Sequence, residues 1–119
     1  MYGAAVKVTI RLVTTGRRTG GEREATLYAF EDGDRLVVVG SVGGAARDPA
    51  WVHNLRAEPR ARVARNAATH AVTAVEAKGP ERDRLWTLVT EAFPLYTTYQ
   101  ARTRRRIPIF ALEPEPDVR

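Results

Sequence analysis

Polar and hydrophobic residues alternate near the start of the chain, as in a strand with one buried face. Val6 and every second residue up to Leu12 are apolar, whereas the residues between them are polar. This pattern predicts a strand over residues 6–14. Glycines at positions 16, 20 and 21 then interrupt the alternation, and they predict a loop.

Two strands joined by a tight turn are expected next. The pair Asp32-Gly33 is a strong turn signal, and it separates an expected strand over residues 24–31 from another over residues 35–40. Residues 36–39 form an uninterrupted apolar run rich in valine. Such a run predicts a buried central strand.

The rest of the chain mixes short strands with helices. Further strands are expected over residues 61–65, 69–77 and 108–112, with a turn at Asn66. Helices are expected over residues 48–57, 80–93 and 95–104, the first with Asp48 as its cap and Pro49 in its first turn. The proline-rich tail, residues 113–119, is expected to be frayed.

About six short strands and two or three helices predict a mainly β fold in one domain, residues 1–119. Closure into a β-barrel is favoured because it removes exposed sheet edges. A doubly wound parallel sheet is not expected, since the helices do not alternate with the strands.

Composition excludes several kinds of chemistry and of location. The chain has no cysteine, which rules out disulfides, zinc–thiolate sites, iron–sulfur clusters and thiol nucleophiles. Residues 1–13 lack the pattern of a signal peptide, and the apolar runs are too short to cross a bilayer. A cytoplasmic location is expected, with peripheral contact to the inner face of a membrane left open.

The formal net charge of +5 is carried mostly by arginine, since Lys7 and Lys78 are the only lysines. Arginine makes forked contacts to phosphate and carboxylate, so the excess fits an anionic partner such as nucleic acid, anionic lipid or a phosphorylated ligand. A genome rich in G and C also favours arginine over lysine, so the excess of arginine is explained equally well without a functional role.

The first candidate site is the loop over residues 14–20 together with Arg23. Its glycines let backbone N–H groups approach a ligand, and Arg17, Arg18 and Arg23 add donors for phosphate or carboxylate. The loop matches neither the Walker A pattern nor the GxGxxG fingerprint. A solvated hairpin loop explains the same residues equally well.

The second candidate site follows the expected central strand. Ser41, Gly43 and Gly44 precede a helix start, which suits an anion or the edge of a ring. In the helix, Trp51 is placed to stack on a flat ring and Asn54 to hydrogen-bond a ligand. The alternatives are a tryptophan in the core and an asparagine that bridges the backbone.

The third candidate site is aromatic. Phe93, Tyr96 and Tyr99 are spaced by three and share one helix face, as either a hydrophobic stripe or a wall over a bound ring. The arginines at positions 102 and 104–106 suit a solvated helix end, with an anionic coenzyme or a membrane surface as alternative partners. No metal site is expected, because His53 and His70 lack the spacing of a ligand pair.

Three segments of the chain resemble the deazaflavin-dependent nitroreductase family, whose members bind coenzyme F420: they are TTGRRTGGERE, GSVGGAARDPAWVHNLRAEP and EAFPLYTTYQARTRRRIPIF. The resemblance covers residues 13–114. It implies a split β-barrel of the kind shared with FMN-binding, pyridoxamine-phosphate-oxidase-like proteins. It also implies an F420H2-dependent oxidoreductase that passes hydride to a quinone, a nitro compound or an activated alkene.

The resemblance further implies roles for individual residues. Arg17, Arg18 and Arg23 hold the phosphate and glutamate tail of the coenzyme. Tyr96 and Tyr99 face the substrate, and one of them donates a hydrogen bond or proton to the substrate oxygen. The coenzyme is lined by five residues: Ser41, Gly43, Gly44, Trp51 and Asn54.

Some positions depart from the family pattern. Arg18 stands where lysine is common, Val42 where a lysine or other polar residue is frequent, and Ala25-Thr26 where a polar–proline pair is common. Phe93 replaces the first of three tyrosines seen in the nitroimidazole-reducing member, so nitroimidazole reduction is not implied for this chain.

Two other functions are left open by the sequence. One is a carrier barrel that binds FMN or haem without turnover. The other is a basic barrel for single-stranded nucleic acid, which is not the expected partner because the aromatic residues do not interleave with basic ones on one strand face. A homodimer is possible, since barrels of this kind often pair, and the expected partner is a small-molecule substrate.

Overall fold

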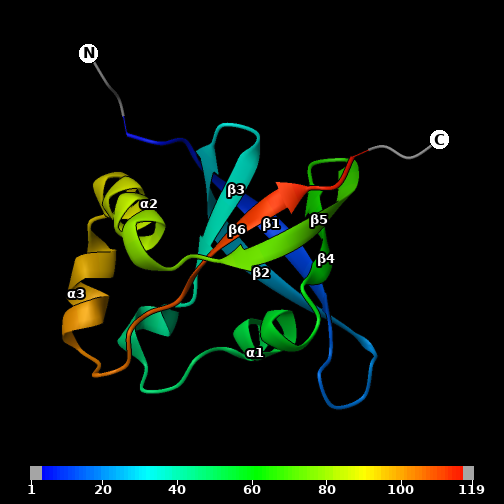
Figure 1. Cartoon of the computed structure of the whole chain (residues 1–119), viewed down its shortest axis with the longest axis horizontal. Coiled ribbons are helices and arrows are strands. Elements are labelled where there is room, and N and C mark those ends of the chain that lie inside the picture. The colour runs from blue at the N-terminus through cyan, green and yellow to red at the C-terminus, as the bar shows by residue number, and fades with distance from the viewer. Residues whose placement is uncertain (1–3, 117–119) are drawn as a thin grey trace.

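The strands form a closed antiparallel barrel in the computed structural model, which describes residues 4–116. The order around the barrel is β1-β2-β3-β6-β5-β4 (Figure 1). This arrangement confirms the expected mainly β barrel. The six strands are β1 (Lys7–Thr15), β2 (Glu22–Asp32), β3 (Arg35–Val39), β4 (Arg60–Arg65), β5 (Ala68–Glu76) and β6 (Ile109–Pro114).

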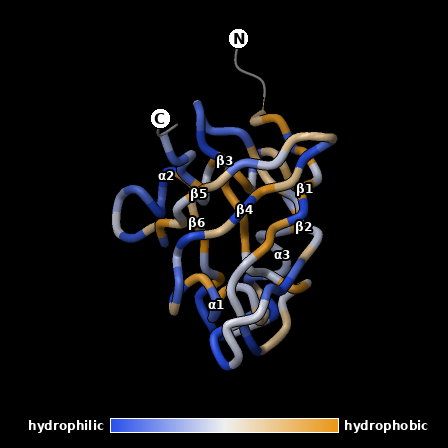
Figure 2. The backbone as a smooth tube through the Cα atoms, turned by 90° about the vertical axis from the view of Figure 1, so that its right-hand side faces the viewer, coloured by the Kyte–Doolittle hydropathy of each residue, from blue (hydrophilic) through white to orange (hydrophobic). Residues whose placement is uncertain are grey.

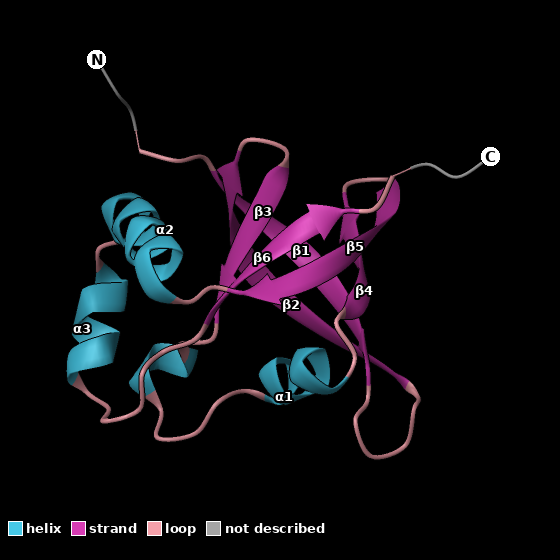
Figure 3. Cartoon of the chain, in the orientation of Figure 1, coloured by secondary structure: helices cyan, strands magenta, loops and turns pink. Residues whose placement is uncertain are grey.

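The helices lie outside the barrel, with α2 and α3 to one side and α1 below one end in the view of Figure 3. They are α1 (Ala50–Ala57), α2 (Gly79–Ala92) and α3 (Leu95–Ala101), with a short 3-10 turn η1 (Val42–Gly44) after β3. No helix among residues 4–116 is long and apolar enough to cross a membrane.

Two hydrophobic cores explain why the apolar pattern differs between strands. Figure 2 shows hydrophobic residues recurring along the strands of the barrel wall. One core fills the barrel and includes Val38 of β3 and Phe110 of β6. The other lies outside the barrel wall and joins Val37 of β3 to Leu85 of α2 and Tyr96 of α3. The central strand β3 is therefore buried on both faces, as its uninterrupted valine run predicts.

The last strand is longer, and the third helix shorter, than the sequence pattern predicts. Glu113 pairs with Thr73 and Pro114 with Val72, so the expected fraying from residue 113 is wrong for these two residues. Pro114 is tolerated because it stands at the end of the strand. Helix α3 stops at Ala101 rather than at residue 104. Residues 117–119 of the expected tail lie outside the described residues.

The start of α1 also differs from the expectation. Pro49 occupies the cap position without a side-chain hydrogen bond, so Asp48 is not the cap. The Asp48 carboxylate instead accepts hydrogen bonds from Arg105 at 2.6 Å and from Arg56 at 3.1 Å. The carboxylate of Asp48 thus pairs with two guanidinium groups and not with the backbone N–H groups that a capping carboxylate binds.

Candidate active site

The glycine-containing loop between β1 and β2 is closed by its own backbone. The N–H of Gly16 donates to the carbonyl of Gly21 at 2.7 Å, and the N–H of Gly20 donates to the carbonyl of Gly16 at 2.8 Å. Gly20 has a φ of 76°, a conformation that glycine adopts at little cost. The loop therefore has a defined shape, although the side chains of Arg17 and Arg18 are exposed.

Asn54 of α1 fixes this loop from beneath. Its side-chain oxygen accepts a hydrogen bond from the backbone N–H of Arg17 at 3.1 Å, and its side-chain nitrogen donates to the Thr14 hydroxyl at 3.0 Å. Asn54 is only 4% exposed. The residue thus bridges the backbone, one of the two roles that the sequence leaves open, and it does so at the floor of a cavity.

That cavity has a volume of about 1080 Å³ and lies between the β1–β2 loop, α1 and the loop before α1. We call it the arginine cavity, because its lining includes five arginines: Arg17, Arg18, Arg23, Arg47 and Arg105. Among the described residues, the acidic ones in the lining are Glu24 and Asp48. Such an excess of guanidinium groups favours a ligand with several negative charges.

Arg23 is held in place within this cavity. Its guanidinium group donates to the Thr19 hydroxyl at 3.1 Å and to the carbonyl of Glu22 at 2.9 Å. Arg17 and Arg18 make no side-chain hydrogen bond to the described residues. Part of the cationic surface is therefore fixed, and part is free to adjust to a ligand.

A second, smaller cavity of about 380 Å³ adjoins the first. We call it the aromatic cavity, because Tyr28, Phe93, Tyr96 and Tyr99 line it together with Trp51. Trp51 lines both cavities and so stands at their junction. It also belongs to the barrel core, with 7% exposure and an edge contact to Phe110 at 5.9 Å between ring centroids.

The aromatic side chains of this cavity contact one another in edge-to-face fashion. The ring of Phe93 lies 4.9 Å from that of Tyr96 and 5.6 Å from that of Tyr28, between centroids. The ammonium group of Lys7 lies 4.2 Å from the ring centroid of Tyr28. These contacts make a rigid apolar wall with a cation at its outer edge.

Tyr96 is 4% exposed, and burial raises the pKa of its phenol above the ordinary value. Its hydroxyl makes no hydrogen bond to the described residues, yet it is not sealed away from solvent. A phenol in this state stays protonated at physiological pH. It can donate a hydrogen bond to a ligand oxygen in the cavity.

The chemistry of the aromatic cavity is limited to hydroxyl and indole groups. Its described lining holds no carboxylate, imidazole or amine, and its polar side chains are those of Thr26, Tyr28, Ser41, Trp51, Tyr96 and Tyr99. A site of this kind binds and orients planar molecules. Hydroxyl and indole groups do not carry hydride, so a hydride transfer there would depend on a bound coenzyme.

The loop between β3 and α1 connects the two cavities. Ser41 and Val42 line the aromatic cavity, and Ala46 to Asp48 line the arginine cavity. Gly43 and Gly44 line neither cavity. A Cβ at Gly44 would lie 2.6 Å from the carbonyl oxygen of Tyr99, so this glycine allows the loop to touch α3.

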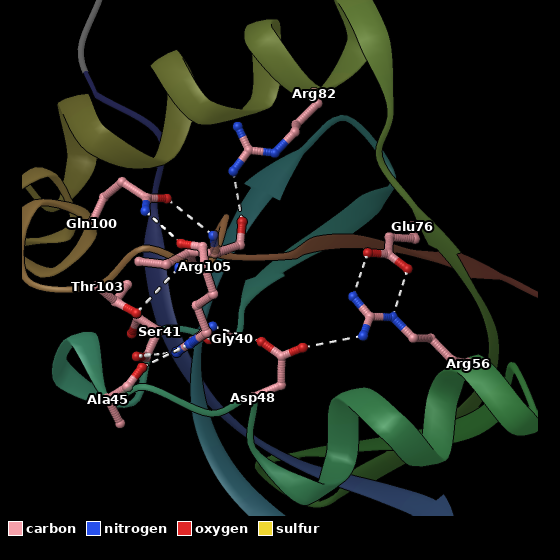
Figure 4. Close-up of polar contacts among 11 residues, drawn as sticks. Gly40, Ser41, Ala45, Asp48, Arg56, Glu76, Arg82, Gln100, Thr103 and Arg105 are labelled. Carbon is pink, nitrogen blue, oxygen red and sulfur yellow. Dashed lines mark hydrogen bonds and ion pairs between the residues drawn. The ribbon is translucent and has the colours of Figure 1, made fainter.

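Arg105 ties this loop to the segment that follows α3 (Figure 4). Its guanidinium group donates to the backbone carbonyls of Gly40, Ser41 and Ala45 at 2.7–2.9 Å and to the Asp48 carboxylate at 2.6 Å. The side chain is 14% exposed. The expectation of a solvated helix end is therefore wrong for Arg105, because the chain turns after α3 and carries this residue inward.

The three candidate segments of the sequence thus meet at one end of the barrel. Arg17, Arg18, Arg23 and Asn54 meet at the arginine cavity, Ser41, Tyr96 and Tyr99 at the aromatic cavity, and Trp51 between them. No sequence signal pointed to the lining residues Tyr28 and Arg47, whereas Arg105 belongs to the basic cluster for which an anionic coenzyme is one of the expected partners. Sequence reasoning also missed His53, which lines the arginine cavity from α1, whereas His70 is exposed on β5. Within residues 4–116, no group of three His, Cys, Asp or Glu side chains is placed to hold a metal ion.

Comparison with known proteins gives consistent results. The model of the F420H(2)-dependent quinone reductase family matches residues 3–114. An F420H(2)-dependent quinone reductase of Mycobacterium tuberculosis (strain ATCC 25618 / H37Rv) is 39% identical over 107 residues, which cover 87% of this chain and 72% of that protein.

Solved structures agree with these sequence matches. A structure described as an F420-H2 dependent reductase (FDR-A) has a TM-score of 0.80 and 35% identity, and the match covers 88% of this chain and 93% of that chain. Another, described as a domain-swapped dimer, has a TM-score of 0.81 and 35% identity, covering 88% of this chain and 79% of that chain.

Proposed function

Because the chain belongs to the F420H(2)-dependent quinone reductase family, we propose that it is an F420H2-dependent oxidoreductase that reduces a quinone or a similar small electrophile. The observation that carries this proposal is the pairing of the two cavities. A cavity rich in arginine adjoins an aromatic cavity whose described lining has no carboxylate, imidazole or amine, and Trp51 lines both. A coenzyme with a flat ring and an anionic tail fits that arrangement.

The tail of the coenzyme belongs in the arginine cavity. Arg17 and Arg18 are free to reach its phosphate and glutamate carboxylates, and Arg23 is already oriented by Thr19. Guanidinium groups suit both kinds of anion because they form paired hydrogen bonds. Asn54 supports this cationic surface by fixing the backbone of Arg17.

The ring of the coenzyme belongs at the junction of the cavities. Trp51 offers an aromatic side chain there, and Ser41 offers a hydroxyl in the adjoining aromatic cavity. Gly43 and Gly44 act through the shape of their loop, since neither lines a cavity. When bound and reduced, the coenzyme supplies the hydride that the protein itself does not carry.

The residues of the aromatic cavity act on the acceptor. Phe93, Tyr28 and Trp51 exclude water and hold a planar molecule by contact with their rings. Tyr96 and Tyr99 offer hydroxyls to the acceptor oxygen, where negative charge develops as it is reduced. The high pKa of Tyr96 makes it a hydrogen-bond donor rather than a source of protons.

The coenzyme assignment is tested by titrating the protein into oxidised F420 and following the fluorescence of the ring, with FMN as the comparison. We expect saturable binding of F420 that weakens about tenfold or more when Arg17 and Arg18 are both changed to Ala, because each contributes a charge-assisted contact. Replacing Arg65, a basic residue that lies outside both cavities, is the matched control. Binding of F420 that is unaffected by the paired substitution would contradict the assignment of the tail.

The same titration separates the alternative functions. Binding of FMN but not F420, with no turnover, would indicate a carrier barrel. Salt-sensitive binding of single-stranded nucleic acid without affinity for F420 would indicate a nucleic-acid module.

Assembly and location stay predictions. A homodimer is supported by a domain-swapped dimer among similar solved structures and by exposed apolar side chains such as Val75 and Leu95. The mass of the protein in solution tests it against the 13.2 kDa of one chain. A cytoplasmic location stays a prediction. Peripheral membrane contact is supported by the net charge of +5, and flotation with anionic vesicles tests that contact.

A further inference from the structure

We propose that Arg105 is a positioning residue for the reaction, which holds the loop of residues 40–48 in a strained shape and in fixed register with the tyrosines of α3. The effect on catalysis rests on the proposed function, whereas the effect on the loop does not. Four hydrogen bonds of 2.6–2.9 Å run from this one guanidinium group to four residues of the loop: Gly40, Ser41, Ala45 and Asp48.

The loop needs such support because the backbone of Val42 is in an unfavourable conformation. Val42, Gly43 and Gly44 have φ values of 43°, 60° and 86°. Valine is β-branched and rarely adopts a positive φ, so this conformation persists only where the surroundings impose it. Arg105 binds carbonyls on both sides of these three residues, at Ser41 and at Ala45.

Arg105 is itself anchored to α3. Gln100, in the last turn of that helix, donates to the backbone carbonyl of Arg105 at 2.8 Å and accepts from the N–H of Ile107 at 3.0 Å. Gly44 lies close enough to Tyr99 for a Cβ to clash with its carbonyl. The loop that carries Ser41 and the helix that carries Tyr96 and Tyr99 are thus linked at two points.

A chain of ion pairs joins this linkage to the barrel (Figure 4). Asp48 accepts from both Arg105 and Arg56, and Arg56 makes two hydrogen bonds of 2.8 and 2.9 Å to the carboxylate of Glu76 on β5. The loop is therefore held against α3 and the sheet together. This frame fixes the position of Ser41 relative to Tyr96 and Tyr99 in the protein without ligand.

Lysine cannot replace arginine in this position. The four acceptors surround a planar fork, and three of its nitrogens take part. An ammonium group is a single point of charge and cannot reach the carbonyls of Gly40, Ser41 and Ala45 from one place. Arg105→Lys keeps the positive charge at the arginine cavity but removes the guanidinium group. The variant therefore tests the hydrogen bonds that position the loop while the attraction of an anionic coenzyme tail is kept.

The test compares Arg105→Lys with Arg106→Lys, the same change at a neighbouring side chain that is 68% exposed. Hydrogen exchange of residues 41–48 is measured on the protein without coenzyme, and the rate of a single turnover is measured at saturating F420H2 and quinone. In Arg105→Lys we expect faster exchange of this loop and a rate that falls about tenfold to a hundredfold, because misplaced reactants react slowly. Arg106→Lys is expected to match the unmodified protein in the exchange of the loop and in the single-turnover rate.

Unchanged exchange of the loop in Arg105→Lys would overturn the proposal. So would an unchanged rate at saturation with weaker coenzyme binding alone, since Arg105 would then be only an anion ligand. If the unmodified protein shows no turnover, the proposed function fails, and the exchange data still test the loop.

Two further variants keep the test decisive if Arg105→Lys folds poorly. Asp48→Asn leaves the guanidinium in place but removes its carboxylate partner, and it is expected to accelerate exchange of the same loop. In Arg105→Ala, added ethylguanidinium is expected to restore part of the lost rate, relative to sodium chloride at equal ionic strength. Absence of both effects overturns the proposal.

Discussion

At the scale of single residues, Tyr96 is a buried aromatic residue that also lines a cavity. Its ring is buried among Phe30, Phe93 and Tyr99, with centroid distances of 4.9–6.1 Å. Its hydroxyl has no partner among the described residues and lies at the aromatic cavity. A fixed donor of this kind needs no reorganisation when charge develops on a bound acceptor.

The role of the phenol groups is tested by changing Tyr96 and Tyr99 to Phe, singly and together. Phenylalanine keeps the ring contacts, so the thermal midpoint is expected to change little. The double variant is expected to lose about a hundredfold to a thousandfold in kcat, the usual effect of removing a donor to a developing oxyanion. Steady-state oxidation of F420H2 by a quinone measures the effect, and unchanged turnover in the double variant would exclude both tyrosines.

Individual roles could be predicted from the sequence only where a local motif carries them. The loop of Arg17 and Arg18 and the aromatic spacing of Tyr96 and Tyr99 are visible as short patterns, and both lie at cavities. Arg105 lies 57 residues from Asp48, so no local pattern links them. Asp48 itself has the appearance of a helix cap in the sequence, and only the fold shows that a distant arginine uses it.

At the scale of elements, an ion-pair cluster fastens α2 to the β2–β3 hairpin. Arg84 of α2 donates to both oxygens of Asp32 at 2.9 and 3.1 Å, and Arg35 donates to Asp32 at 2.6 Å. Hydrogen bonds from Arg84 and Arg35 lower the pKa of Asp32 from 3.8 to about 2. Because α2 covers the outer core and leads into α3, the cluster supports the wall that carries the tyrosines.

This lowered pKa predicts how stability depends on pH. A carboxyl group with a lower pKa in the folded state stabilises the protein above pH 3.8, and the contribution is lost as pH falls toward about 2. Asp32→Asn is expected to lower the free energy of unfolding by about 1–2 kcal/mol at neutral pH, allowing for solvent screening of Arg84.

Urea unfolding of both proteins at several pH values measures the Asp32 effect. The difference in the free energy of unfolding between the unmodified protein and Asp32→Asn is expected to become smaller below pH 3.8. Asp34→Asn, an exposed change in the same turn, is the control. If this difference in the free energy of unfolding stays constant down to pH 2, the ion pairs with Asp32 do not stabilise the fold.

Most elements could be predicted because hydrophobic periodicity is local. The turn at Asp32-Gly33 and the buried run of β3 are evident from neighbouring residues. The ends of α3 and β6 could not be predicted, because Gln100 turns the chain by binding the backbone at residues 105 and 107, and Thr73 pairs with Glu113. Such boundaries depend on partners that are distant in the sequence.

At the scale of the whole molecule, the site is formed where three separate stretches of chain meet at one end of the barrel. The β1–β2 loop supplies Arg17 and Arg18, the loop before α1 connects the cavities, and α3 supplies Tyr96 and Tyr99. The barrel core and the outer core hold these stretches from opposite sides of the barrel wall. The arrangement suits a coenzyme that lies across the end of the barrel with its acceptor beside α3.

The most direct test of this account is to mix F420H2 with a quinone, with and without the protein, and to follow the return of the fluorescence of oxidised F420. We expect oxidation that needs the protein, saturates with both reactants and slows when Tyr96 and Tyr99 are changed to Phe. Oxidation that is no faster with the folded protein than without it, across quinones of different size, would contradict the account.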